Sequence, residues 1–466
     1  MNILPLIKIY ENLINGVLSK NPYFYQLEDK INTIGDELTI DILREIIEFI
    51  DLSYKNSQER KDNYYVKKTM NRTLITEMGL LVFTKTYYQT KQADENGKYH
   101  CFSYIEEVLG LEKWAKMTLN AEVALINMAT DVNMEYSSKK AIRNYEISRQ
   151  TLSKKIRKLN VNQPDDIKRV SNSPSHLYIE MDEIHASLQT KRNKIVPIAL
   201  IHEGYKEYFV NRKELKNKHY IGASILSYEQ VWGEVYAYVD RKYDIDKIKF
   251  LFVSGDGASG IKSYTSVFPY AIYVLDKFHY RKALNYIFKR DKILTKIADD
   301  YLRNNRTEDL KLLVKIMIEK HPSQEKYMLE KQKYLLNNIE GIKNQKHKEY
   351  LCPCSMEGHI SHKFASYITS RPFGFSEDGL ENKIQLLIMK ANGMKINQIT
   401  YLKLKHEENY YKKIKLQKFK SKYKHMKNIS NSNIEHLSLS YQIPILIGKN
   451  SGTKTLIESL TKDRDI

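Results

Sequence analysis

Cysteine, tryptophan and long apolar segments are scarce in this sequence of 466 residues. It contains three cysteines and two tryptophans. Three cysteines cannot build a disulfide framework, so we expect a reducing environment and a cytoplasmic location. No segment approaches the roughly 18 uninterrupted apolar residues of a membrane span, and the N-terminal residues show no signal-peptide pattern. These absences predict a protein without a membrane partner.

Acidic residues are also in deficit. The sequence has 75 lysines and arginines against 56 aspartates and glutamates, a formal net charge of +19. A basic excess of this size suits a polyanionic partner, and nucleic acid is the first candidate. The chain is also rich in Lys, Asn, Ile and Tyr, which an AT-rich genome would encode. A lysine-rich surface would follow from that composition alone, so charge by itself leaves both explanations open.

The pattern of apolar residues changes several times along the chain, which predicts a multidomain α/β protein. Leu38–Ile50 has the amphipathic stripe of a helix, and Arg72–Tyr88 is β-rich with a turn at Gly79. We expect an α+β module at 1–110, a helical region at 111–160, a mixed-sheet core at 176–279 and 351–400, a helical insertion at 280–350, and a basic tail at 401–466.

A short basic helix is predicted at Arg149–Leu159, with Ser148 as its N-cap. Another helical segment precedes it, and this is the arrangement of a helix-turn-helix DNA reader. The candidate DNA-binding residues are polar or basic: Arg149, Gln150, Lys154 and Lys155. The alternative is an ordinary solvated surface helix, since basic amphipathic helices are common at protein surfaces.

Carboxylates follow two predicted strands. The apolar stretch His176–Ile179 leads directly into three acids, Glu180, Asp182 and Glu183. The stretch Phe250–Val253 leads to Asp256 between two glycines. In open α/β sheets, side chains at strand ends gather at one ligand-binding edge.

A third acid, Glu357, lies in a polar loop beside Gly358 and two histidines. Hard divalent cations prefer carboxylate oxygens, and two such ions can clamp a phosphoryl group. The sequence therefore predicts a shared Mg²⁺ site.

Simpler explanations exist for several of these residues. Asp256 could be a turn residue between glycines. Glu180 alternates with Asp182 on the same strand face, so it could support the site or face solvent, and we favour the second. A zinc site is the rival metal centre, and its four potential ligands are Cys352, Cys354, His359 and His362. Their spacing is tighter than that of the usual zinc finger, which disfavours this alternative.

Five ordered motifs resemble those of the ISLre-type bacterial insertion-sequence transposases, which are similar in pattern to Mutator-like DDE transposases. The motifs are Y-I-E-M-D-E-I-H, S-G-D-G-A, L-D-K-F-H, E-G-H-I-S-H and S-R-P-F-G-F-S. The resemblance implies a ribonuclease H-like catalytic core split by a helical insertion. It implies three catalytic, metal-binding carboxylates, Asp182, Asp256 and Glu357, with support from Glu180, Asp276, His279 and His359.

The resemblance also implies an activity. Two Mg²⁺ ions, or Mn²⁺ in their place, would serve cleavage at the ends of a mobile element and joining of those ends to target DNA, by at least a dimer. Two positions depart from the family pattern: Ile184 replaces an acid, and Gly260 replaces a tryptophan. If that acid were a required ligand, the chain would be a decayed copy that only binds DNA. A nuclease without strand joining is the third alternative.

Overall fold

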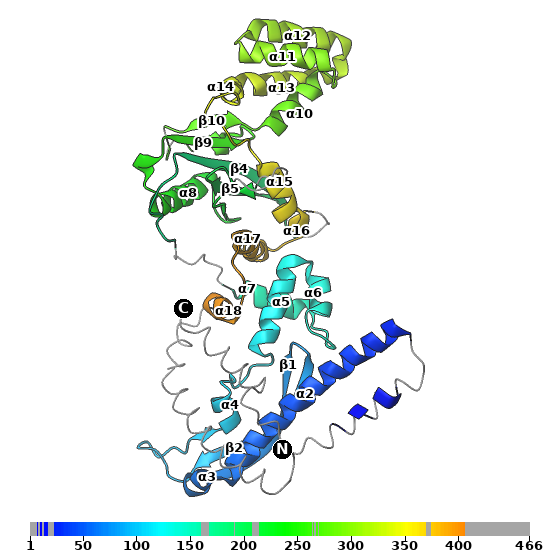
Figure 1. Ribbon diagram of the computed structural model, residues 1–466, viewed down its shortest axis with the longest axis vertical. Coiled ribbons are helices and arrows are strands. Elements are labelled where there is room, and N and C mark those ends of the chain that lie inside the picture. The colour runs from blue at the N-terminus through cyan, green and yellow to red at the C-terminus, as the bar shows by residue number, and fades with distance from the viewer. Residues whose placement is uncertain are drawn as a thin grey trace.

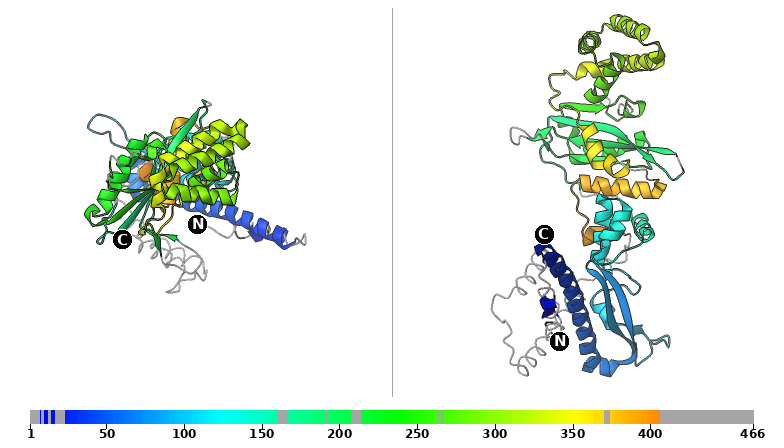
Figure 2. Two further views of the ribbon diagram at one scale, coloured as in Figure 1. Left: turned by 90° about the horizontal axis from the view of Figure 1, so that it is seen from above. Right: turned by 90° about the vertical axis from the view of Figure 1, so that its right-hand side faces the viewer.

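The computed structural model describes residues 23–405 apart from 160–166, 191, 207–213, 263, 265, 266, 269 and 370–373, together with 7, 10, 11 and 14–16. The molecule is elongated (Figure 1). A block of helices lies at one end, a mixed sheet follows, then a small helical bundle, and a long helix with a hairpin lies at the other end (Figures 1 and 2). Most of the expected basic tail, and the strand expected at 207–211, lie outside the described residues.

The N-terminal module combines a long helix with an antiparallel sheet. Its elements are α2 (Phe24–Asn56), α3 (Gln58–Asn63), β1 (Tyr64–Thr76), β2 (Gly79–Thr90), β3 (Cys101–Phe102) and α4 (Tyr104–Val108). The predicted turn is confirmed: β1 pairs with β2, and Gly79 has a φ of +138°, which a side chain would disfavour. The predicted helix over Leu38–Ile50 is confirmed as part of α2.

The helical region contains α5 (Leu119–Asp131), α6 (Met134–Lys140) and α7 (Arg149–Arg157). The helix predicted at Arg149 is confirmed, and the Ser148 hydroxyl accepts a hydrogen bond from the Thr151 amide as an N-cap does. The core of this region also includes side chains of α17 (Glu377–Ala391) and α18 (Gln398–Leu404), among them Leu386 and Tyr401. The helical region is therefore completed by distant C-terminal sequence.

The central sheet is mixed and has the strand order β10-β9-β4-β5-β8. The strands are β4 (His176–Ser187), β5 (Asn193–His202), β8 (His219–Gly222), β9 (Phe250–Gly255) and β10 (Ile272–Leu275). Strand β4 is antiparallel to β5 and parallel to β9, β5 is antiparallel to β8, and β9 is parallel to β10. The mixed sheet with its flanking helices confirms the predicted α/β class.

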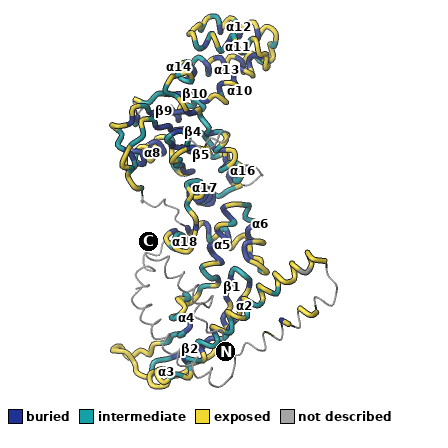
Figure 3. The backbone as a smooth tube through the Cα atoms, in the orientation of Figure 1, coloured by how far each residue is buried: buried dark blue, intermediate teal, exposed yellow. Residues whose placement is uncertain are grey.

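Both faces of the sheet are covered. On one face, Ile179 and Val253 pack against Val235 of α8 (Tyr228–Lys242). On the other face, Tyr178 and Ile184 join a core with α17 and with α15 (Met356–Ile360), whose helix continues through a π-helical turn at Ser361–Ala365 and α16 (Ser366–Ile368). Figure 3 shows buried residues along the strands of the sheet.

The predicted helical block between Asp276 and Glu357 is confirmed. It consists of α10 (Lys277–Ile287), α11 (Lys292–Arg303), α12 (Thr307–Lys320), α13 (Glu325–Asn337) and α14 (Ile339–Asn344) around its own apolar core. The remaining short elements are β6 (Tyr205–Lys206), β7 (Glu214–Leu215), α9 (Ser259–Lys262), and the 3₁₀ turns Ile245–Lys247 and Pro322–Gln324. No helix in the described part of the chain is long and apolar enough to cross a membrane.

Candidate metal centre

Asp182 lies in the middle of the central strand β4, at the point where the pairing of β4 with its parallel neighbour β9 ends. We expected the strand to end at the acids, and this was wrong: β4 runs to Ser187, so Glu180, Asp182 and Glu183 are all within it. Pairing with the parallel neighbour β9 ends at Met181 opposite Gly255, whereas Asp182 still pairs with Ile198 of β5. Asp182 is thus the first residue of β4 beyond the end of β9.

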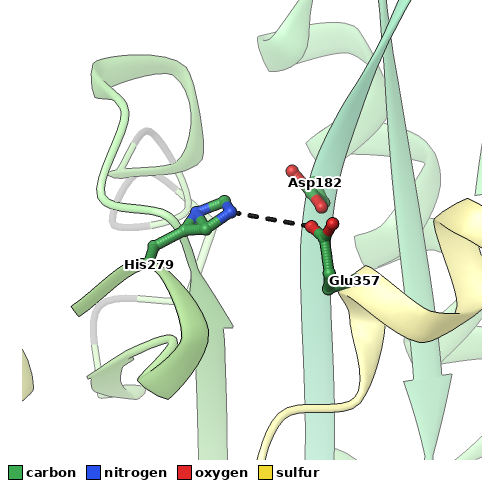
Figure 4. A group of neighbouring side chains, drawn as sticks. All are labelled: Asp182, His279 and Glu357. Carbon is green, nitrogen blue, oxygen red and sulfur yellow. Dashed lines mark ion pairs between the residues drawn. The ribbon is translucent and has the colours of Figure 1, made fainter. Parts of the chain in front are cut away.

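Three side chains from three elements meet at this point. Asp182 on β4, His279 on α10 and Glu357 on α15 each offer one potential ligand atom, and these atoms lie within 4.8 Å of one another. His279 Nε2 is 3.6 Å from Glu357 Oε2 (Figure 4). Within the described residues, this is the only group of three or more His, Cys, Asp or Glu side chains with that geometry.

The local electrostatics are those of crowded carboxylates. Burial, together with the negative charges of Glu357, Asp256 and Asp276, raises the pKa of Asp182 to about 7. Burial also raises the pKa of Glu183 and that of Asp276. A bound cation would relieve this repulsion and favour the ionised carboxylates.

Asp256 lies close to this group but outside it. It follows β9 directly, and its charge acts on both Asp182 and Glu183. Its side chain accepts a hydrogen bond of 2.8 Å from the Ala258 amide, and its carbonyl accepts one of 2.6 Å from the Tyr334 hydroxyl. The structure thus brings His279, rather than Asp256, into the ligand group with Asp182 and Glu357.

Asp276 holds the start of the helix that carries His279. Its carboxylate accepts a hydrogen bond of 3.2 Å from the Phe278 amide and caps α10. The D-x-x-H spacing puts His279 in the first turn of this capped helix. Asp276 therefore fixes the backbone that presents the imidazole to the site.

Glu180 does not face solvent, and that expectation was wrong. Its side chain is only 2 % exposed, and its two oxygens have different partners. One oxygen lies 3.1 Å from His202 Nε2. The other accepts hydrogen bonds of 2.9 and 3.0 Å from the Ser355 amide and hydroxyl. Because Ser355 precedes α15, Glu180 holds the base of the helix that carries Glu357.

The four residues of the alternative zinc site do not form a ligand group within the described residues, and His362 is exposed. Cys352 is buried in the apolar core under the sheet, and burial raises the pKa of Cys354 well above its usual value. His359 Nδ1 contacts the Tyr220 hydroxyl, and burial lowers the pKa of His359 to about 4. The His359 side chain thus points from α15 toward Tyr220 of β8 and not toward the group around Glu357.

The two unusual sequence positions have local explanations. Ile184 is buried in the core below the sheet, two residues beyond Asp182 on the same face. Gly260 lies against Tyr228, and a Cβ there would be 2.4 Å from the aromatic ring. The Tyr228 hydroxyl in turn donates a hydrogen bond to the Glu183 carboxylate. The glycine therefore leaves room for a tyrosine that holds an acid of β4.

The candidate DNA-binding helix α7 presents part of its basic face to solvent. Arg149, Gln150 and Lys154 are exposed, whereas Lys155 forms an ion pair with Glu122 of α5. Lys155 therefore has an internal role in the bundle.

Three supporting residues escaped sequence reasoning: His202, Tyr334 and Ser355. His202 and Tyr334 gave no recognisable signal. Ser355 stands immediately before a helical pattern, where it could have been expected to bind a partner.

Comparison with known proteins gives one consistent result. The profile of a family described as an uncharacterised protein family, UPF0236, matches residues 18–405. A protein of Caldanaerobacter subterraneus subsp. tengcongensis named UPF0236 protein TTE2489 is 28% identical over 433 residues, which is 92% of this chain and 91% of the relative. A second protein of that organism, whose name joins eleven designations, is 28% identical over 436 residues, 92% of this chain and 91% of the relative.

These findings correct the family suggested by the sequence motifs. The expected membership of the ISLre-type transposases was wrong, because the matching profile and the relatives carry the UPF0236 description and no transposase family matches. Four of the five motifs are short stretches around an acid, and such stretches recur wherever carboxylates bind a metal, so these motifs did not identify the family.

Proposed function

The chain belongs to the UPF0236 family, and we propose that it is a metal-dependent DNA transposase that cleaves and joins DNA strands. The observation that carries this proposal is the convergence of Asp182, His279 and Glu357 within 4.8 Å, with the charge of Asp256 close by. These residues come from the central strand, from the helical block and from a helix beyond it.

The proposed core is ribonuclease H-like. Support comes from the strand order, in which a hairpin and a third antiparallel strand (β4, β5, β8) are extended by two parallel strands (β9, β10) beside β4. Helix α8 joins the antiparallel part to the parallel part. Acids on the central strand and at the end of its parallel neighbour then lie at one edge of the sheet.

The donor set fits a hard divalent cation. Asp182 and Glu357 supply carboxylate oxygens and His279 adds an imidazole, while the Asp256 carboxylate acts on the site through its charge. Magnesium binds through one or two carboxylates together with substrate phosphates and water, and manganese accepts the same oxygens. Such ions, when bound, activate an attacking oxygen and stabilise a departing one.

The protein's own residues would act mainly by positioning. Asp182 and Glu357 would hold the cations against a phosphate, and Glu180 would keep α15 in place for Glu357. The His279 imidazole lies 3.6 Å from Glu357 and would either pair with that carboxylate or bind the cation. In phosphoryl transfer, orientation and charge stabilisation supply most of the rate.

The names of the relatives agree with a mobile element. One name joins eleven designations in a single organism, and another joins four. Many designations for one protein are what a sequence present in many copies would produce. A net charge of +19 suits a DNA substrate, and cutting both ends of an element would require at least two subunits in a cytoplasmic complex.

The test uses a plasmid that carries the gene with its native flanking DNA. Purified protein should cut the plasmid at the element ends and join the freed ends to a second DNA in the presence of Mg²⁺ or Mn²⁺. Asp182→Asn and Glu357→Gln should lose at least a hundredfold in rate, while Glu308→Gln on the exposed surface of α12 should retain it. Cleavage that survives in both site variants would refute the proposal.

Two other outcomes would identify the alternative activities. Cut but never joined products would indicate a nuclease. Tight binding of end DNA without cleavage in either metal would indicate a protein that only binds DNA.

A further inference from the structure

We propose that the outer face of α10 binds a single-stranded segment of DNA beside the metal centre. This inference takes its substrate class from the proposed function. The face borders a hollow of about 600 Å³. Five of its lining residues, at 278, 281, 282, 285 and 286, recur at helical spacing and form one side of α10, and Lys289 and Arg290 follow just beyond the end of the helix.

The charge of this hollow is of one sign. Four of its seven lining residues are cations, Arg281, Lys282, Lys289 and Arg290, and none is acidic. Within the described part of the chain none of the four forms an ion pair with a carboxylate. Lys289 forms a hydrogen bond with the neutral Gln324 side chain and lies over the Tyr286 ring. Unpaired cations around one groove attract phosphates.

Two aromatic rings are exposed among these cations. Phe278 is 48% exposed and Tyr286 is 36% exposed. Lys282 lies over the Phe278 ring at 5.8 Å, and Lys289 over the Tyr286 ring at 4.7 Å. A basic groove with aromatic platforms is the arrangement by which proteins hold unpaired bases. A purely electrostatic phosphate site would not need the exposed rings.

The backbone at the end of α10 supports a built site. Lys289 and Arg290 have φ angles of +50° and +65°, a region that side chains other than Gly and Asn rarely adopt. Two consecutive cations in this conformation cost folding free energy, and such strain collects at functional positions. The opposite side of α10 is held by Tyr280, Ala283 and Leu284 in the core of the helical block, so its outer face is fixed in orientation.

The groove begins at the metal centre. Phe278 precedes His279, and their ring centroids are 5.3 Å apart. From Phe278 to Ile287, where α10 ends, the helix extends about 14 Å, a length of a few nucleotides. A strand with its reactive phosphate near Asp182 and Glu357 could therefore continue along α10 with one base on Phe278.

The experiment measures binding of a fluorescent single-stranded oligonucleotide of mixed sequence to the full chain, by anisotropy and without divalent cations. Arg281→Gln/Lys282→Gln should weaken binding roughly tenfold and reduce the slope of log affinity against log salt by about 1.4. Phe278→Leu keeps an apolar side chain but no stacking face, and should weaken binding at least fivefold. The matched control is Lys315→Gln/Lys320→Gln, on the exposed side of α12.

Equal binding by the α10 double variant and the α12 control would overturn the inference. So would a Phe278→Leu variant that binds as wild type does, since the site would then hold phosphate alone. Thermal unfolding establishes that each variant is folded. A failure of the proposed catalytic function can be distinguished from a failure of this binding proposal, because Asp182→Asn should bind the oligonucleotide normally while losing strand cleavage.

Discussion

Glu180 on the central strand accepts two hydrogen bonds from Ser355, at 2.9 Å from the amide and 3.0 Å from the hydroxyl. The two residues are 175 positions apart in the chain. Through this contact a buried carboxylate fixes the start of α15, and with it the position of Glu357. Its second oxygen lies 3.1 Å from His202 Nε2, so the same carboxylate also ties β4 to β5.

Removal of that carboxylate should be costly. Glu180→Ala leaves the His202 ring and the Ser355 amide without their buried partner, and we expect a loss of about 3 kcal/mol in the free energy of unfolding. Ser355→Ala keeps the amide hydrogen bond and should lose only about 1 kcal/mol. Denaturant titration measures both. Equal losses in the two variants would contradict the argument, because the buried carboxylate would then have no role beyond the hydroxyl contact.

The stability of the metal-free protein should fall as pH rises from about 4 to about 7. The pKa of Asp182 is about 7 in the folded state and 3.8 as the ordinary value. Between these values the unfolded carboxyl is ionised while the folded one keeps its proton, so folding binds a proton and each increase in pH disfavours it. Above about pH 7 both states are ionised, and this contribution becomes constant.

Asp182→Asn should remove that part of the pH dependence. Both proteins are compared in a chelator at pH 5 and pH 8. From pH 5 to pH 8, the unfolding temperature of wild type should fall by several degrees more than that of the variant. Parallel curves for the two proteins would show that Asp182 does not hold a proton at neutral pH.

Divalent cations should stabilise the folded protein through the same side chains. A ligand that binds only the folded state adds about 2.7 kcal/mol at 100 times its dissociation constant. Mn²⁺ should therefore raise the unfolding temperature of wild type, and Asp182→Asn or Glu357→Gln should abolish most of the increase. Glu308→Gln, on the surface of α12, serves as the control and should respond as wild type does.

Two glycines near the start of α8 should respond oppositely to alanine. At Gly260 the added Cβ would lie 2.4 Å from the Tyr228 ring, which must move away from its contact with Glu183. We expect Gly260→Ala to destabilise the protein by about 2 kcal/mol. Gly233 lies at an exposed position within α8, and nothing lies within 4 Å of the Cβ that alanine would add there. Gly233→Ala should therefore stabilise the folded protein by up to about 1 kcal/mol. Calorimetry of both variants tests the pair, and equal signs would contradict the packing argument.

The sequence by itself determined the local elements. Alternating apolar residues predicted the hairpin with its turn at Gly79 and the apolar run that becomes β9. Helical spacing predicted the block of α10 to α14, and Ser148 marked the start of α7. These features depend on neighbours within a few residues, so a local pattern contains most of the information about them.

Tertiary structure alone decided which acids meet. Strand β4 continues past its acids because β5 pairs with it from Tyr178 to Ser187, and the residues near Asp182 give no sign of that partner. Glu180 became buried, and His279 rather than Asp256 reached Asp182 and Glu357, because α10 and α15 converge on the sheet from either side of the helical block. The distance between such side chains depends on packing between segments far apart in the chain, and a local pattern carries no measure of it.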